Sequence, residues 1–134
     1  MTAFIQMTPA MNMTPTMKMI PVTNLLRDLP SAAAGEVFET LLERPGVKLE
    51  RIVSEGQTTP EDDWYDQDRD EWVLLLAGAA RLTVEVAGGA PEDRDMVPGD
   101  AILLPAHCRH RVAWTDPDRP TVWLGLHVTP ARAG

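Results

Sequence analysis

Residues 98–115, PGDAILLPAHCRHRVAWT, contain the pattern that decides the fold. The Pro-Gly-Asp step at 98–100 predicts a turn, and the apolar run at 101–104 is typical of a short strand. Residues 109–115 then alternate in the way that a second strand does, with one set of side chains on each face. The first set is His110, Val112 and Trp114, and the second includes Arg109 and Arg111.

The rest of the chain from residue 24 repeats this arrangement of short strands and turns. Pro45 and Gly46 predict a hairpin turn between residues 36–44 and 47–54, although 36–44 is also compatible with a helix. Further strands are expected at 71–77, 80–87 and 121–128, and one helical turn is expected near residues 24–30. Many short strands without a long amphipathic helix predict an all-β sandwich or barrel.

The strand at 71–77, EWVLLLA, is apolar on both faces. Trp72, Leu74 and Leu76 point one way, while Val73 and Leu75 point the other. Both faces should therefore be covered, the outer one by a second sheet, the N-terminal segment or a partner subunit. Because edge strands in a small barrel invite pairing between subunits, we expect a homodimer.

The stretch after Gly99 resembles the second conserved motif of the cupin superfamily. Cupins have Gly, five residues, Pro, and a metal-binding His several residues later; here Gly99 is followed by DAILL, Pro105 and then His110. His107 replaces a common Gly, and Trp114 replaces a common Asn. The first cupin motif, His-x-His-Glu-Gly, aligns through Glu71 and Gly78, but Tyr65 and Gln67 stand in the two histidine positions. The chain thus resembles a short, single-domain bacterial cupin.

The resemblance implies a small cupin-type, jelly-roll β-barrel with a metal or ligand site inside. Glu71 and His110 would be metal ligands with Gln67 as a third, and the metal would be a divalent transition metal such as Zn, Mn, Fe or Ni. Tyr65, His107 and Trp114 would line a ligand pocket. This arrangement implies a metal-dependent enzyme that acts on a small molecule. The alternative is a metal-free module that binds or senses a small molecule, in which Glu71 and His110 form a buried hydrogen-bonded pair.

Other polar residues are given simpler interpretations. The acidic run around residues 61–70 is expected to be a solvated loop, because crowded carboxylates repel one another. Cys108 is expected to be an inert turn residue. His127 alternates with an apolar set of side chains, so we expect it on the exterior or at the subunit contact.

The composition limits the possible partners and compartments. A net charge of −8 argues against a nucleic-acid partner, and the single cysteine allows no intrachain disulfide. No apolar run is long enough to cross a membrane, so a cytoplasmic protein is expected. Residues 1–23 are rich in Met and Thr-Pro and should be extended or disordered, which leaves 24–134 as a single barrel domain. The methionines suit Cu(I), but their irregular spacing and the lack of nearby His or Cys argue against a copper site.

Overall fold

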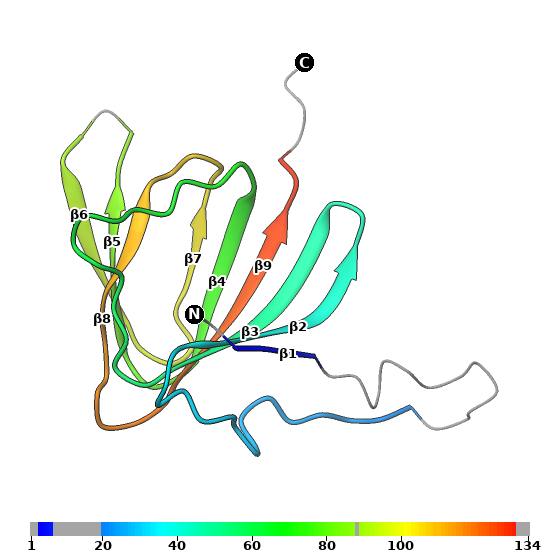
Figure 1. Ribbon diagram of the computed structural model, residues 1–134. Helices are drawn as coiled ribbons and strands as arrows, with labels where there is room; N and C mark the ends of the chain where they lie inside the picture. The colour runs from blue at the N-terminus through cyan, green and yellow to red at the C-terminus, as the bar shows by residue number, and fades with distance from the viewer. Residues whose placement is uncertain (1–2, 7–19, 88, 131–134) are drawn as a thin grey trace.

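The computed structural model describes residues 3–6, 20–87 and 89–130, which form two facing sheets (Figure 1). The strands are β1 (Ala3–Gln6), β2 (Val37–Arg44), β3 (Val47–Ser54), β4 (Asp70–Ala77), β5 (Ala80–Glu85), β6 (Pro91–Met96), β7 (Ala101–Leu104), β8 (His110–Thr115) and β9 (Thr121–Val128). One sheet has six strands in the order β1-β2-β3-β9-β4-β7, and the other has three in the order β6-β5-β8. Within the described parts of the chain there is no helix, and hence none that could cross a membrane. The predicted all-β class is confirmed.

Most strands lie where the sequence pattern places them, with two exceptions. The hairpin of β2 and β3 turns at Pro45 and Gly46, as expected. The strand β6 was not predicted, because five of its six residues are exposed and it has no apolar alternation. It forms through pairing with β5, by backbone hydrogen bonds and by the side-chain contacts of Arg81 with Asp95 and of Thr83 with Asp93. The strand β1 pairs in parallel with β2, while residues 7–19 of the expected extended segment lie outside the described residues.

The main core lies between the two sheets. It contains the inward-facing side chains of both layers, which are Val73, Leu75, Ala80, Leu82, Val84, Met96, Leu104 and Trp123. On β4 the inward set is Val73 and Leu75, so the predicted alternation of this strand is correct. Burial of such side chains stabilises each by about 1.5–3 kcal/mol relative to exposure.

Only one part of the outer face of the six-stranded sheet is covered, next to β2 and β3. Residues 20–35 cross it there, and Ala32 packs with Val37 and Val53 in a second small core. Beside this core the Arg51 guanidinium donates to Glu39 through Nε and Nη2, at 2.7 and 2.8 Å, and to the Leu25 carbonyl at 2.9 Å. The described N-terminal residues thus supply part of the cover that the sequence requires.

The remaining outer face carries a line of apolar side chains, which we call the outer row. One residue from each of β2, β3, β9, β4 and β7 lies in register with its neighbour: Leu42, Leu49, Leu126, Trp72 and Leu103. Trp72 is 40% exposed and Leu103 is 59% exposed. The expectation that this face is fully covered therefore does not hold for the part of the chain that the structure describes.

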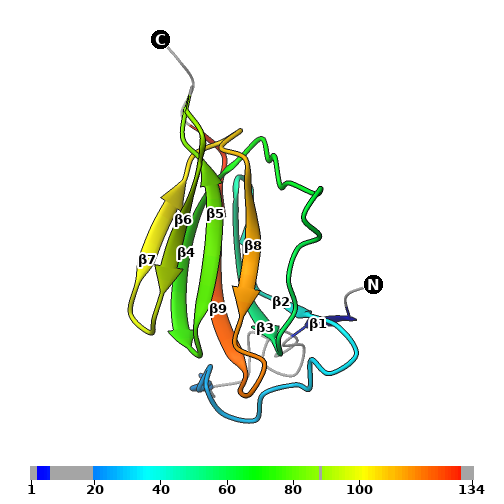
Figure 2. The same cartoon turned by 90° about the vertical axis from the view of Figure 1, so that its left-hand side faces the viewer.

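The segment from residue 55 to 69 connects β3 to β4 and runs beside β8 (Figure 2). Thr59 N donates to the Val112 carbonyl at 2.8 Å, and Val112 N donates to Thr59 Oγ1 at 3.0 Å. Tyr65 and His110 exchange two backbone hydrogen bonds, at 2.7 and 3.1 Å. The segment therefore covers the otherwise free edge of β8 and holds Tyr65 and Gln67 near the barrel interior.

Candidate functional site

A cavity of about 90 Å³ lies between the sheets near the start of β4 and β8. Its polar lining residues are Glu36, Glu50, Tyr65, Gln67, Glu71, His110 and His127. Its apolar lining residues are Phe38, Ile52, Val73, Leu82, Leu104, Val112 and Trp123. A buried water needs roughly 10–15 Å³, so the cavity holds a ligand of only a few non-hydrogen atoms.

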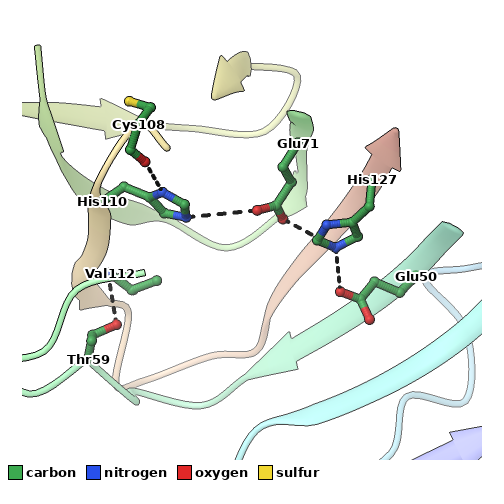
Figure 3. Close-up of polar contacts among 7 residues, drawn as sticks. All are labelled: Glu50, Thr59, Glu71, Cys108, His110, Val112 and His127. Atoms are coloured by element: carbon green, nitrogen blue, oxygen red, sulfur yellow. Dashed lines mark hydrogen bonds and ion pairs between the residues drawn. The ribbon is translucent and has the colours of Figure 1, made fainter. Parts of the chain in front are cut away.

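Glu71 is the centre of the polar group in this cavity (Figure 3). It lies at the start of β4, is 7% exposed, and has one imidazole on each side of its carboxylate. Its Oε1 is 3.8 Å from His110 Nε2, and its Oε2 is 3.7 Å from His127 Nε2. Both distances are longer than a hydrogen bond, so Glu71 and His110 are not the hydrogen-bonded pair that the simpler interpretation expects.

His110 is held by the backbone in one orientation. Its Nδ1 is 2.9 Å from the Cys108 carbonyl, which can only accept, so Nδ1 carries a proton and donates it. The ring also stacks on Tyr65, with centroids 5.4 Å apart and planes at 22°. These contacts direct Nε2 at Glu71 and leave it available for chemistry.

His127 and Glu50 belong to the same group, and the sequence interpretation missed both. His127 was expected on the exterior or at a subunit contact, and this prediction is wrong, because His127 is 4% exposed and lines the cavity. Its Nε2 lies 2.9 Å from Glu50 Oε1 on β3. The physical reason is that Trp123 and His127 face the interior, while the aliphatic residues of β9 form part of the outer face.

Gly125 makes room for this polar group. A Cβ at this position would lie 3.1 Å from Glu71 Oε2, and 3.7 Å from Glu50 Cγ and from His127 Nε2. The missing side chain thus leaves space for two carboxylates and an imidazole between β3, β9 and β4. Gly125 lies between Trp123 and His127 in the sequence, and this small residue was the available signal that β9 turns its polar face inward.

Gln67 and Tyr65 line the cavity from the segment that covers β8. The Gln67 Oε1 atom is buried and has no hydrogen-bond partner among the described residues. His127 Nδ1 is likewise buried and has no hydrogen-bond partner among the described residues. Since buried polar atoms are normally paired, the unpaired acceptor of Gln67 indicates a position where a ligand donor belongs.

Two residues expected in the pocket do not line it. Trp114 is 42% exposed, because a register shift between Arg81 and Leu82 in the β5–β8 pairing changes the alternation after Val112. His107 has a positive φ of 63° and is exposed, and its Nδ1 lies 2.8 Å from Asp66 Oδ1 outside the cavity. The predicted roles of Trp114 and His107 are corrected accordingly.

Burial changes the acid–base properties of the site. It raises the pKa of Glu71, and the Glu50 carboxylate raises it further, although His127 and His110 act in the opposite direction. The pKa of Tyr65 is also raised, by burial and by the Glu36 carboxylate. Cys108 lies beside the site with a pKa raised by burial, which disfavours its thiolate and agrees with an inert residue.

A groove of about 400 Å³ adjoins the cavity and shares Glu36 and Tyr65 with it. Its other lining residues are Thr58, Thr59, Pro60, Asp63 and Trp64. A ligand that enters from the groove would therefore pass Glu36 and Tyr65 before it reaches Glu71.

No protein-family model and no curated protein matches the chain, but solved structures resemble it. One from Ralstonia eutropha JMP134, named a "putative mannose-6-phosphate isomerase", is 50% identical with a TM-score of 0.75 and covers 82% of this chain and 99% of its own. A cupin superfamily protein from Desulfitobacterium hafniense DCB-2 has 18% identity and a TM-score of 0.58, over 82% of this chain and 99% of its own.

The chain belongs to the cupin superfamily. It is a small cupin with the expected jelly-roll fold. A more distant structure of the same fold, FeII HppE, has 12% identity and a TM-score of 0.57, over 69% of this cupin and 49% of its own chain.

The cavity of this cupin does not fit a metal in the usual cupin manner. Among the residues that the structure describes, no group of three or more His, Cys, Asp or Glu side chains is placed to hold a metal ion. Figure 3 shows the reason, since Glu71 stands between His110 and His127 and the two imidazoles do not meet at one point. Tyr65 and Gln67 occupy the positions where the first motif would supply histidines.

Proposed function

We propose that this cupin binds a small organic molecule in its cavity and that Glu71 exchanges a proton with it. The observation that carries the proposal is a buried carboxyl group between two imidazoles, in a cavity with otherwise mostly apolar walls. Pockets for small molecules have this composition, with a few polar groups that orient the ligand.

The surrounding residues have separate roles in this proposal. Glu71 touches the ligand as a general acid or base, since its raised pKa brings it closer to the pH at which proton transfer is efficient. His110 and His127 flank the Glu71 carboxyl group, and Glu50 orients His127 through their 2.9 Å contact.

Ligand-observed NMR with a library of small fragments tests the proposal. We expect fragments that bind the wild type and lose about tenfold or more in affinity with Glu71→Gln, as expected for removal of a charge-assisted hydrogen bond. Glu92→Gln is the control, since Glu92 is an exposed acid on β6 outside the cavity. The proposal fails if no fragment perturbs the cavity, or if both variants change binding equally.

A metal-dependent enzyme is the second candidate function, with a divalent transition metal (Zn, Mn, Fe or Ni) on Glu71, His110 and Gln67. Two observations favour this second function. Gln67 Oε1 is buried without a partner among the described residues, and the Cys108 carbonyl accepts a hydrogen bond from His110 Nδ1, as carbonyls do for the metal-bound histidines of many sites. Metal analysis of the purified wild type and of His110→Ala separates the two functions. A stoichiometric metal that is lost with His110→Ala would replace the metal-free proposal.

We also propose that this cupin is a cytoplasmic homodimer. The outer row gives a second copy an apolar surface to cover, which supports the dimer. The single free cysteine, Cys108, fits a reducing compartment. The net charge of −8 continues to argue against nucleic acid as a partner.

A further inference from the structure

The cavity and the groove beside it are lined by acids and by no basic residue other than histidine. Within the described residues, the two linings contain Glu36, Glu50, Asp63 and Glu71, and neither contains Lys or Arg. Glu50 has cationic partners, because Lys48 Nζ lies 3.9 Å from its Oε2 and His127 Nε2 lies 2.9 Å from its Oε1, and two imidazoles flank Glu71. Glu36 is a lining carboxylate that has no such partner among the described residues.

Glu36 is the acid that lines both the groove and the cavity. It is half-buried where the groove joins the cavity, and its Oε2 accepts a hydrogen bond of 2.5 Å from the Ser54 hydroxyl. Among the described residues, no Lys, Arg or His forms an ion pair with it. A partly buried carboxylate without a cationic partner is costly, and a cationic ligand would remove that cost.

Several acceptors face the cavity, beside the donors of the Tyr65 hydroxyl, the Gln67 amide nitrogen and the two imidazoles. The carboxylates of Glu36 and Glu71 and the unpaired Oε1 of Gln67 can all accept, and Gln67 Oε1 has no donor among the described residues. An ammonium group has three donors and a positive charge, and it also suits the faces of aromatic side chains such as Tyr65 and Trp123. A phosphate or carboxylate ligand would instead bring acceptors to acceptors.

From these features we infer that the ligand of this cavity is a small organic cation, a primary amine with a short apolar body, and that anions such as sugar phosphates are rejected. The inference rests on the proposed function and names its ligand class. It also separates this cupin from the activity in the name of the Ralstonia protein, because mannose 6-phosphate is an anion and much larger than the cavity.

Four probes of different charge test the inference on the full-length protein. Isobutylamine, isobutanol and isobutyrate share one carbon skeleton, and mannose 6-phosphate is the fourth; binding is followed by protein-observed NMR shifts of the cavity residues. We expect the amine to bind about tenfold or more tightly than the alcohol, as for a hydrogen bond that gains a charge. We expect no binding of the two anions.

The variant Glu36→Gln should weaken the amine about tenfold and leave the alcohol unchanged. Asp118→Asn removes the same charge from an exposed turn outside the cavity and should change neither. Alcohol or anion binding equal to that of the amine would overturn the inference while the proposed acid–base function stands, provided that Glu71→Gln still weakens that binding. If none of the four probes shifts the cavity residues, the inference fails, and the fragment library decides separately on the proposed function. The ranking of probes on the wild type does not depend on whether Glu36→Gln folds.

Discussion

At the scale of single residues, Glu71 combines two properties that oppose each other. Its carboxyl group is buried, which disfavours the charged form, and it lies beside two imidazoles, which favour it. Burial is the larger effect, so the pKa of Glu71 is raised. The ionised form of Glu71 therefore reduces the stability of the fold. The site keeps this carboxyl group although it lowers stability when it is ionised.

Glu71→Gln should accordingly change the dependence of stability on pH. The pKa of Glu71 is higher in the folded state than in the unfolded state, where it is near 4.5. The resulting stability is fully present below the unfolded-state pKa and is lost as the pH rises through the folded-state pKa. The wild type loses this stability and the neutral Gln variant does not. We therefore expect the Tm of Glu71→Gln minus that of the wild type to increase from pH 4 to pH 8.

Calorimetric melting at several pH values measures this difference, and Glu92→Gln serves as the exposed control with no such trend. A difference that decreases with pH would show that the two imidazoles outweigh burial at Glu71. In that case the acid–base role would belong to an ionised carboxylate instead.

The sequence could predict one half of the polar group and not the other. Glu71 and His110 follow from motif spacing, because a short turn and a strand fix their positions. His127 and Glu50 do not, because long-range pairing alone places β9 beside β4 and β3 on the other side of β9. A strand that carries apolar residues on both faces gives no sign of which face turns inward.

At the scale of elements, the turn between β4 and β5 depends on one glycine. Gly78 has a φ of +84°, and a Cβ there would lie 2.4 Å from Thr121 Oγ1, 2.6 Å from Thr121 Cα and 2.7 Å from the Pro120 carbonyl oxygen. The turn therefore packs directly on the start of β9. Any side chain at this position must displace backbone as well as adopt a left-handed conformation.

Gly78→Ala should lower the free energy of unfolding by about 3 kcal/mol, of which roughly 1–2 kcal/mol is backbone strain and the rest is overpacking. Gly99→Ala is the matched control, since Gly99 has a φ of +96° and nothing within 4 Å of its Cβ position. It should show the strain alone. Urea unfolding of both variants gives the comparison, and equal losses would mean that the contact with Thr121 is not tight.

Elements with an apolar pattern could be predicted, and those without one could not. β7, β8 and β9 appear at their expected positions because turn residues bound apolar runs. β6 is charged and mostly exposed, so its pairing with β5 defines it rather than an apolar pattern. The bulge that turns Trp114 outward likewise depends on the β5–β8 register and has no signal in the local sequence.

At the scale of the whole molecule, the two faces of the six-stranded sheet have different roles. The inner face carries the cavity, while the outer face carries the outer row. Residues 20–35 cover only part of that outer face. A second copy of the chain is the partner that we propose for the rest.

The variant Leu103→Glu tests the proposed dimer, because Leu103 is 59% exposed in the outer row. We expect the wild type to sediment as a dimer at micromolar concentration, and Leu103→Glu to weaken dimerisation at least about tenfold, as for an interface residue that is truncated or charged. Val97→Glu is the control, because Val97 is equally exposed but lies in the turn before β7. A wild type that is a monomer at this concentration contradicts the proposal.

Gly125 has a consequence for the search for proteins that share this cavity. Since a Cβ there would lie 3.1 Å from Glu71 Oε2, a glycine at this position favours the close arrangement of Glu50, Glu71 and His127 in a relative with the same chemistry. Overall likeness of the barrel does not reveal this, because most cupins share the strands. A filter that requires Glu71, His110 and the Gly125-x-His127 step together would divide small cupins into those that can build this acidic cavity and those that cannot.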